Sequence, residues 1–254
     1  MIEISGLSKT YSTRDGTDIH ALRDINVSIN HGQLVTLVGP SGCGKSTLLR
    51  ILGGIARKSS GEVRLRGTSV DGPSRQVGMV FQSPVLLPWR TILQNTLLPS
   101  QLHGDGMARR PIAKENLRLV GLEGFEERYP AELSGGMQQR VSIARALTHD
   151  PDLLLMDEPF GALDAMTRES MNLDLLKIKE RSGKTVILVT HSIPEAVFLA
   201  DRVVVMSPRP GRIVEVIDVE LPKPRVLEMV NSKEFGSIVA RIRAHFNSLG
   251  TLDA

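Results

Sequence analysis

The sequence is poor in cysteine and has no long hydrophobic run. Its only cysteine is Cys43, which excludes an internal disulfide and fits a reducing compartment. No apolar run approaches the roughly 18 residues that a membrane-spanning helix needs, so we expect any membrane role to come through partners. No N-terminal targeting segment is expected, because Met1–Leu7 alternates like a short strand. The net charge of only +3 is too weak to argue for nucleic acid by itself.

The remaining composition is ordinary for a soluble globular protein. Hydrophobic residues make up 41% of the chain and charged residues 23%. The 254 residues suit one large domain or two modest ones, and they can bury a full core.

The most informative stretch is Gly39–Thr47, which reads Gly-Pro-Ser-Gly-Cys-Gly-Lys-Ser-Thr and fits G-x-x-x-x-G-K-[ST]. The apolar run Leu34–Val38 before it predicts a buried strand, and Thr47–Leu52 predicts the start of a helix. Glycines let successive N–H groups turn around an anion, and the helix N-terminus adds partial positive charge. Lys45 is predicted to reach the β- and γ-phosphates of a nucleotide, and the Ser46 hydroxyl to bind Mg²⁺. A chance glycine-rich turn is the alternative, and the correct flanks disfavour it.

A second anion-binding helix start is predicted at Ser134-Gly135-Gly136. These residues lie in Leu133–Arg140, which reads Leu-Ser-Gly-Gly-Met-Gln-Gln-Arg and opens a helical stretch. An ordinary serine N-cap is the alternative, which explains Ser134 but not the pair of glycines.

Candidate catalytic groups follow two predicted strands. Asp157 and Glu158 follow the apolar run Leu153–Met156, at the strand end where α/β sheets bind ligands. Asp157 would hold Mg²⁺ through its shell, and Glu158 would orient or deprotonate an attacking water. The alternative for Glu158 is a solvated charge at a strand end. His191 follows the strand Lys184–Val189 and is assigned a role near the γ-phosphate, although a lone histidine is usually structural or merely exposed.

Two further side chains allow two interpretations each. Tyr11 follows a predicted strand and can stack on an adenine face, or it can be a half-buried tyrosine at a strand end. Cys43 precedes a helix N-terminus, a position that can favour the thiolate, or it is a small filler at a variable motif position.

The loop after Gln82 is unusually apolar. Ser83–Trp89 reads Ser-Pro-Val-Leu-Leu-Pro-Trp, and a soluble protein gains nothing from exposing such a patch unless a partner covers it. Tryptophan is also a frequent interface anchor. The alternative is that Trp89 packs as core within a helical region.

The rest of the pattern predicts an early antiparallel sheet, an inserted set of helices and an amphipathic C-terminal helix. Pro111 and Pro130 are expected to punctuate the helices. The predicted strands are Ile2–Leu7, Ile19–Ile29, Gly61–Gly67, Gln76–Phe81, Arg202–Met206 and Ile213–Leu221, and the predicted helices are Ile92–Leu98, Ile112–Val120, Met137–Thr148, Ala165–Arg181, Pro194–Leu199 and Ser232–Leu249.

Together these motifs resemble the ATP-binding subunit of an ABC transporter over nearly the whole chain. Met137 stands where that family's signature usually has glutamine. The matching motifs are the aromatic loop at Tyr11, Walker A at Gly39–Thr47, the Q-loop at Gln82, the signature at Leu133–Arg140, Walker B at Leu153–Glu158, the D-loop at Leu163-Asp164 and the switch histidine His191.

The resemblance implies a fold and a set of functional residues. The expected fold is α/β, a P-loop NTPase (RecA-like) core with an antiparallel β subdomain and an inserted α-helical subdomain. Residues 1–86 and 151–254 would form the catalytic core, and residues 87–150 the helical signature subdomain. The implied catalytic residues are Glu158, His191, Lys45 and Gln82, and the implied metal ligands are Ser46, Gln82 and Asp157. The implied ATP-binding residues are Tyr11, Gly39, Pro40, Ser41, Gly42, Cys43, Gly44, Lys45, Ser46, Thr47, Gln82, Ser134, Gly135, Gly136, Gln138 and Asp164.

The resemblance also implies partners. Two copies would pair head to tail, so that Ser134 and Gly136 serve the nucleotide of the second copy. Gln82 would link the Mg²⁺ site to a loop that receives the coupling helix of a membrane permease, and an external solute-binding protein would act indirectly. The expected location is the cytoplasmic face of the membrane.

The subgroup is indicated by Asp157–Asp164, by Leu86–Trp89 with Asn95, and by Ser207–Ile213, which look like nitrate, sulfonate and taurine importers. The chain ends soon after the core, so a regulatory barrel of the sugar-importer type is not expected. The alternative function is a soluble ABC-type ATPase that acts on nucleic acid or ribosomes. Such proteins usually carry two cassettes or a long coiled-coil insertion, so no nucleic-acid partner is expected.

Overall fold

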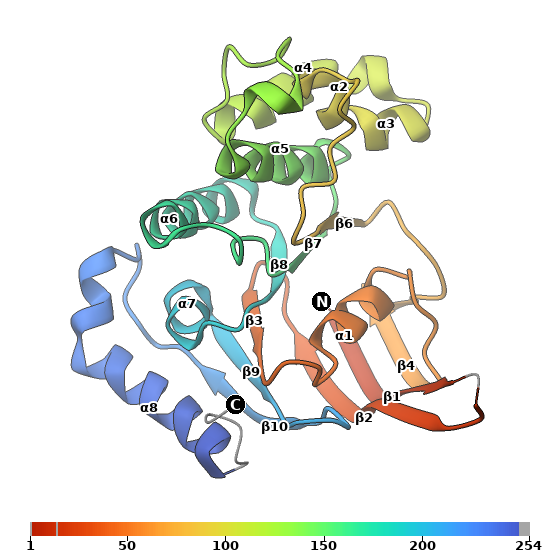
Figure 1. The fold of residues 1–254 in the computed structure, drawn as a ribbon, viewed down its shortest axis with the longest axis vertical. Helices are drawn as coiled ribbons and strands as arrows, with labels where there is room; N and C mark the ends of the chain where they lie inside the picture. The colour runs from red at the N-terminus through yellow and green to blue at the C-terminus, as the bar shows by residue number, and fades with distance from the viewer. Residues whose placement is uncertain (1, 14, 249–254) are drawn as a thin grey trace. The chain divides into compact units, whose positions relative to one another are not determined.

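The computed structural model describes residues 2–13 and 15–248, which divide into two compact units (Figure 1). Unit 1 combines the chain up to Ser74 with the chain from Thr185 onward, and unit 2 spans Arg75–Lys184. Among the described residues, no helix combines the length and apolar composition needed to cross a membrane.

Unit 1 contains the predicted antiparallel sheet, with strand order β2-β1-β4-β5. Its strands are β1 (Ile2–Ser12), β2 (Asp18–Ile29), β4 (Ser60–Leu65) and β5 (Thr68–Ser69). β1 runs beyond the predicted Ile2–Leu7 because register shifts after Ile4 and Leu7 let it stay paired with β2 through Ser12. The tyrosine at position 11 therefore lies in the strand.

The second sheet of unit 1 carries the phosphate loop. β3 (Leu34–Val38) is paired in parallel with β8 (Thr185–Val189) and β9 (Arg202–Met206), and β10 (Ile213–Asp218) is antiparallel to β9. Every residue of β3 and β8 is buried, as expected of parallel strands covered on both faces. Helix α1 (Lys45–Leu52) follows β3, and α7 (Ile193–Leu199) follows β8.

The C-terminal part of unit 1 is a packing element. After the short 3-10 helix η2 (Leu227–Asn231), α8 (Lys233–Ser248) packs against α7, and the two lie side by side in Figure 1. Its buried face consists of Phe235, Val239, Ile242 and Phe246. The predicted amphipathic helix is confirmed, and Leu249 at its predicted end lies outside the described residues.

Unit 2 pairs β6 (Val77–Val80) in parallel with β7 (Leu153–Asp157) and contains a group of helices (Figure 1). These are α2 (Ile92–Thr96), α3 (Leu98–Leu102), α4 (Gly106–Leu119), the 3-10 helix η1 (Pro130–Glu132), α5 (Gly135–Thr148) and α6 (Ala165–Ser182). Helices α2 to α5 fall inside the range 87–150, but the proposed limits of a helical subdomain stay a prediction.

Two helix predictions in this region were wrong. The stretch Ile92–Leu98 is divided into α2 and α3, because Pro99 lacks the N–H that would bond to the Asn95 carbonyl and instead sits in the first turn of α3. Pro111 does not precede a helix but lies inside α4. Pro111 has no N–H to donate to the Met107 carbonyl four residues earlier. Both residues are on an exposed side of α4, where water can replace the missing hydrogen bond.

Candidate functional site

The phosphate loop of unit 1 joins the end of β3 to the start of α1. Gly42 and Gly44 have φ angles of +73° and +105°, which favour glycine. A Cβ on Gly44 would also lie 2.7 Å from a methyl carbon of Leu22. Gly44 is the N-cap of α1 and supplies no side-chain hydrogen bond. No capping side chain therefore competes for the first N–H groups of the helix, which suits an anion.

Lys45 is held within this loop. Its side chain is on the first turn of α1 and is 6% exposed. The ammonium donates to the carbonyl oxygens of Gly39 at 2.7 Å and Pro40 at 3.1 Å. These bonds keep a positive charge beside the N–H groups of the loop, where the phosphates of a nucleotide would be attracted.

The structure overturns the idea that the environment of Cys43 favours the thiolate. Cys43 is 1% exposed, and burial raises the pKa of its thiol, although the positive charge of Lys45 acts in the opposite direction. The thiol sulfur lies 3.9 Å from the Lys45 ammonium. Cys43 therefore stays protonated at neutral pH and acts as a small packing residue under the loop.

Unit 1 brings His191 to the same sheet edge as the phosphate loop. β3 and β8 are parallel neighbours with Leu37 opposite Val189, so Gly39 and His191 both follow the carboxyl ends of adjacent strands. His191 is exposed there. Tyr11 is 40% exposed, and the Lys9 ammonium lies 4.5 Å from the centre of its ring.

Unit 2 brings Gln82 and Glu158 together. Val80 of β6 is paired with Met156 of β7, so both residues follow the carboxyl ends of neighbouring strands. A Cβ on Gly161 would lie 3.6 Å from the Gln82 amide nitrogen and 3.7 Å from the Glu158 Cβ.

Glu158 has a φ of +46°, which is strained for a residue with a side chain and is a frequent feature of functional sites. The carboxylate of Asp157, the amide of Gln82 and, in unit 1, the hydroxyl of Ser46 are hard oxygen donors. Such donors fit Mg²⁺ held together with substrate phosphates.

The signature residues form the N-terminus of α5. Ser134 is the N-cap, and its hydroxyl accepts a hydrogen bond from the Met137 N–H at 3.3 Å. Gly135 is exposed, and a Cβ on Gly136 would lie 3.2 Å from the Thr167 methyl group. The amide nitrogen of Gln138 donates to the carbonyls of Pro130 and Leu133, so a contact between Gln138 and ATP stays a prediction.

Asp164 begins α6 in the same unit. Its carboxylate caps the helix by accepting the Thr167 N–H at 3.0 Å. Hydrogen bonds from the Thr167 side chain and backbone hold the pKa of the Asp164 carboxyl below its usual value. Asp164 is therefore ionised at neutral pH, and its nucleotide-binding role stays a prediction.

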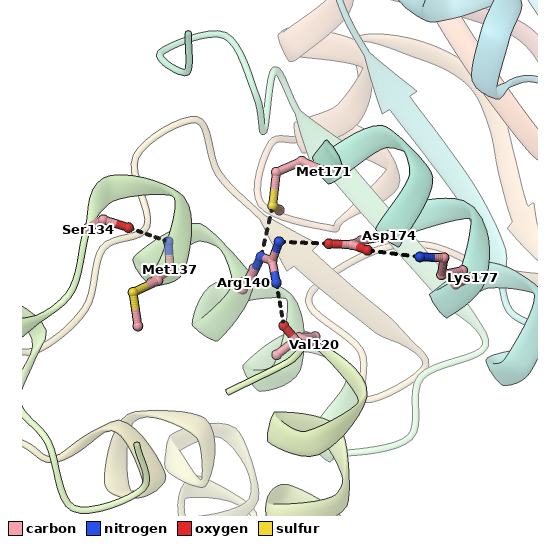
Figure 2. A network of polar contacts seen from close by, with 7 residues as sticks. All are labelled: Val120, Ser134, Met137, Arg140, Met171, Asp174 and Lys177. Carbon is pink, nitrogen blue, oxygen red and sulfur yellow. Dashed lines mark hydrogen bonds and ion pairs between the residues drawn. The ribbon is translucent and has the colours of Figure 1, made fainter. Parts of the chain in front are cut away.

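Arg140 connects the signature helix α5 to neighbouring segments, as Figure 2 shows. Its guanidinium donates to the Val120 carbonyl at 3.1 Å, forms an ion pair with Asp174 at 2.7 Å and contacts the Met171 sulfur. Asp174 also contacts Lys177. One arginine on α5 therefore connects the end of α4 with α6.

The apolar loop after Gln82 is held through its backbone. Gln139 on α5 donates to the carbonyl of Phe81, just before Gln82, and within the loop Arg145 donates to the Pro84 and Val85 carbonyls at 2.7 and 2.8 Å. The buried Asn95 amide bonds both the N–H and the carbonyl of Leu87. Trp89 is nevertheless 71% exposed, so the alternative that it packs as core is wrong.

Sequence reasoning missed the residues that hold these loops. They are Asn95, Gln139, Arg140 and Arg145 in unit 2. Asn95, Gln139 and Arg140 stand in or beside the patterns quoted above, but the sequence did not reveal that they hold the backbone, and Arg145 belongs to no motif.

A glycine-rich loop between a buried parallel strand and a helix N-terminus, with a lysine inside it, defines a P-loop nucleotide-binding protein. The ABC transporter family matches residues 22–161, so the chain belongs to that family. It is an ATPase that binds ATP with Mg²⁺.

The chain is similar to three further proteins that are described as ATP-binding. A taurine import ATP-binding protein of Pelagibacter ubique is 49% identical and covers 82% of this chain and 78% of its own length. An aliphatic sulfonates import ATP-binding protein of Bacillus cereus is 43% identical, over 99% of this chain and 98% of the length of that protein. The dimeric structure of a post-hydrolysis state of the ATP-binding cassette MJ0796, bound to ADP and Pi, is 35% identical with a TM-score of 0.75, and covers 87% of this chain and 100% of its own.

Proposed function

We propose that this protein is the ATP-hydrolysing subunit of a membrane importer for small sulfonates such as taurine. The solute class is supported by the names of its taurine and sulfonate import relatives. The chain would act at the cytoplasmic face of the membrane, bound to permease subunits, with an external solute-binding protein delivering the cargo. Nitrate, the other solute indicated by the sequence pattern, is a small oxyanion of a different class and appears in neither relative's name.

Hydrolysis would use the two groups of residues described above. Lys45 and the N–H groups of the phosphate loop would bind the nucleotide phosphates, and Ser46, Gln82 and Asp157 would hold Mg²⁺, which neutralises charge on the phosphates. Glu158 would orient and deprotonate the attacking water, with His191 near the γ-phosphate.

A head-to-tail dimer would place the exposed start of α5, with Ser134 and Gly136, against the nucleotide of the second copy. The dimeric structures of the similar cassette support the pairing of two copies. Tyr11 would stack on the adenine, and Asp164 would lie in the D-loop between the copies.

A role in coupling ATP hydrolysis to the permease is supported by one observation. The loop after Gln82 combines a fixed backbone with exposed apolar side chains. Val85 and Trp89 are 58% and 71% exposed, while Arg145 and Asn95 hold the loop. A rigid apolar surface binds a partner with little loss of conformational entropy. We therefore assign Val85–Trp89 to the socket for the coupling helix of the permease.

Trp89→Ala tests this assignment. Because the side chain is mostly exposed, the variant should keep the melting temperature and basal ATPase rate of the isolated subunit. Loss of an interface anchor of at least about 2 kcal/mol should weaken binding to the permease about 30-fold or more. Leu102→Ala removes another exposed apolar side chain, 79% exposed on α3, and should bind normally. Normal assembly and transport by Trp89→Ala would refute the socket.

Transport in vesicles tests the solute and the function class together. The chain, its permease and its binding protein should show ATP hydrolysis stimulated by taurine or an alkanesulfonate. The alternative of a soluble ATPase acting on nucleic acid or ribosomes has no support among the similar proteins. Salt-sensitive binding to RNA or DNA, with no permease binding, would favour that alternative.

A further inference from the structure

The turn Ser207–Arg212, which follows β9, touches the phosphate loop at two successive residues. The Arg209 guanidinium donates through Nε to the Gly42 carbonyl at 3.3 Å. Gly211 lies so close to the loop that a Cβ on it would be 2.0 Å from the Cys43 carbonyl oxygen. These contacts lie within unit 1 and join segments far apart in the sequence.

The turn has its own internal fastening. The Ser207 N–H donates to the Arg212 carbonyl at 2.9 Å, and the Ser207 hydroxyl accepts the Arg212 N–H at 3.0 Å. The same hydroxyl donates to the carbonyls of Pro208 and Pro210. Because proline fixes φ on both sides of Arg209, few backbone conformations are open to the turn.

Strand β2 supports both the turn and the loop. The Gly211 N–H donates to the Ala21 carbonyl at 3.0 Å, and the Arg23 N–H donates to the Gly211 carbonyl at 2.9 Å. A Cβ on Gly44 would lie 2.9 Å from the Ala21 carbonyl oxygen. The tip of the phosphate loop is therefore packed against β2 on one side and against the turn on another.

The bond from Arg209 fixes the orientation of one peptide group. In a trans peptide the C=O and the next N–H point in opposite directions. With the Gly42 carbonyl directed toward Arg209, the Cys43 N–H points into the loop and donates to the Pro40 carbonyl at 3.3 Å. This hydrogen bond closes a turn of the phosphate loop, so the bond from Arg209 helps to fix the conformation in which the loop would hold an anion.

We infer that Arg209 is a positioning residue for the nucleotide site, acting through the Gly42 carbonyl, and that Ser207–Arg212 braces the phosphate loop. This inference rests on the proposal that Gly39–Thr47 binds the phosphates of ATP. It adds to the site a residue outside every nucleotide-binding motif named above. It also gives the proline-rich turn a role in setting the affinity for nucleotide.

Arg209→Met keeps most of the side-chain volume but removes the donor. It should raise the KM for ATP about threefold to tenfold while kcat stays within about twofold, because a uniformly used binding interaction is lost. The affinities for ADP and for a non-hydrolysable ATP analogue should fall in parallel, since the whole loop is affected. Arg209→Lys should recover at least half of the loss. Arg212→Met is the matched control and should bind normally, because Arg212 is an exposed arginine of the same turn whose side chain forms no hydrogen bond or ion pair with any other described residue.

A second variant reaches the loop by the other contact. Gly211→Ala forces the Cys43 carbonyl to shift and should weaken ADP binding, with the melting temperature measured alongside to verify folding. Three results would overturn the inference: an unchanged KM in Arg209→Met, normal ADP binding by folded Gly211→Ala, or weakening of the ATP analogue alone. The last result would mean direct contact with the γ-phosphate. Lys45→Ala is measured in parallel, because normal ADP binding there would refute the proposed phosphate site itself.

Discussion

Replacing Arg140 by alanine tests how firmly the signature helix is held. The guanidinium donates to the Val120 carbonyl, which belongs to the C-cap of α4 and has no partner within its own helix. It also pairs with Asp174 on α6. Alanine removes both interactions and leaves the end of α4 without its cation.

The size of the effect follows from the burial of the pair. A hydrogen bond from a charged donor contributes about 1.5–3 kcal/mol, and the ion pair adds a smaller amount because its side chains are 26% and 25% exposed. We expect Arg140→Ala to lower the free energy of unfolding by about 2–3 kcal/mol. In a chain of this length that corresponds to a fall in Tm of about 4–12 °C.

Two further variants make the test specific, with thermal and urea unfolding as the assay. Lys177→Ala removes the other cation near Asp174, but Lys177 is 67% exposed and 3.5 Å away, so the loss should stay below about 0.5 kcal/mol. Arg140→Lys should lose about half as much as alanine, because one ammonium cannot serve Val120 and Asp174 in the geometry of a guanidinium. A wild-type Tm in Arg140→Ala, or equal losses in Arg140→Ala and Lys177→Ala, would refute the reasoning.

Two other predictions concern chemistry and pH. Glu158→Gln should bind ATP but nearly abolish turnover, and should accumulate an ATP-bound dimer in light scattering; phosphate release at the wild-type rate would remove Glu158 from the mechanism. Burial, with the nearby charges of His103, Arg75 and Arg109, lowers the pKa of His149, so the unfolded chain binds a proton first as pH falls below about 6.5. Stability should therefore drop as the pH falls below about 6.5, and His149→Gln should flatten that slope in Tm measurements.

The sequence was sufficient for those parts of the fold that depend on local patterns. The apolar runs Leu34–Val38 and Leu153–Met156 lie in β3 and β7, because a strand buried on both faces needs continuous apolar residues. The helix limits were harder, since whether Pro111 breaks α4 depends on the exposure of one carbonyl. Pattern reading could not determine that exposure.

The sequence could place candidate residues where a motif implies their chemistry. It could not do so where tertiary contacts determine the environment of a side chain. The strand ends that carry His191 and Gln82 could be placed from periodicity alone. The protonation of Cys43 could not, because it depends on how deeply the thiol is buried under its loop. Likewise Trp89 allowed two interpretations, because its 71% exposure depends on the fold of a loop whose backbone Arg145 and Asn95 hold.

Three arginines share one way of acting, which their place in a sequence pattern does not reveal. Arg140, Arg145 and Arg209 each donate to backbone carbonyls of a loop or helix end, at Val120, at Pro84 and Val85, and at Gly42. A guanidinium has five N–H donors in a fixed plane, so it can fix a peptide group without occupying the side chains beside it. These arginines therefore occupy neither the N-terminus of α1 nor the apolar side chains after Gln82. A lysine at these positions would keep the charge but lose the fixed plane, so the same segments would be held less firmly.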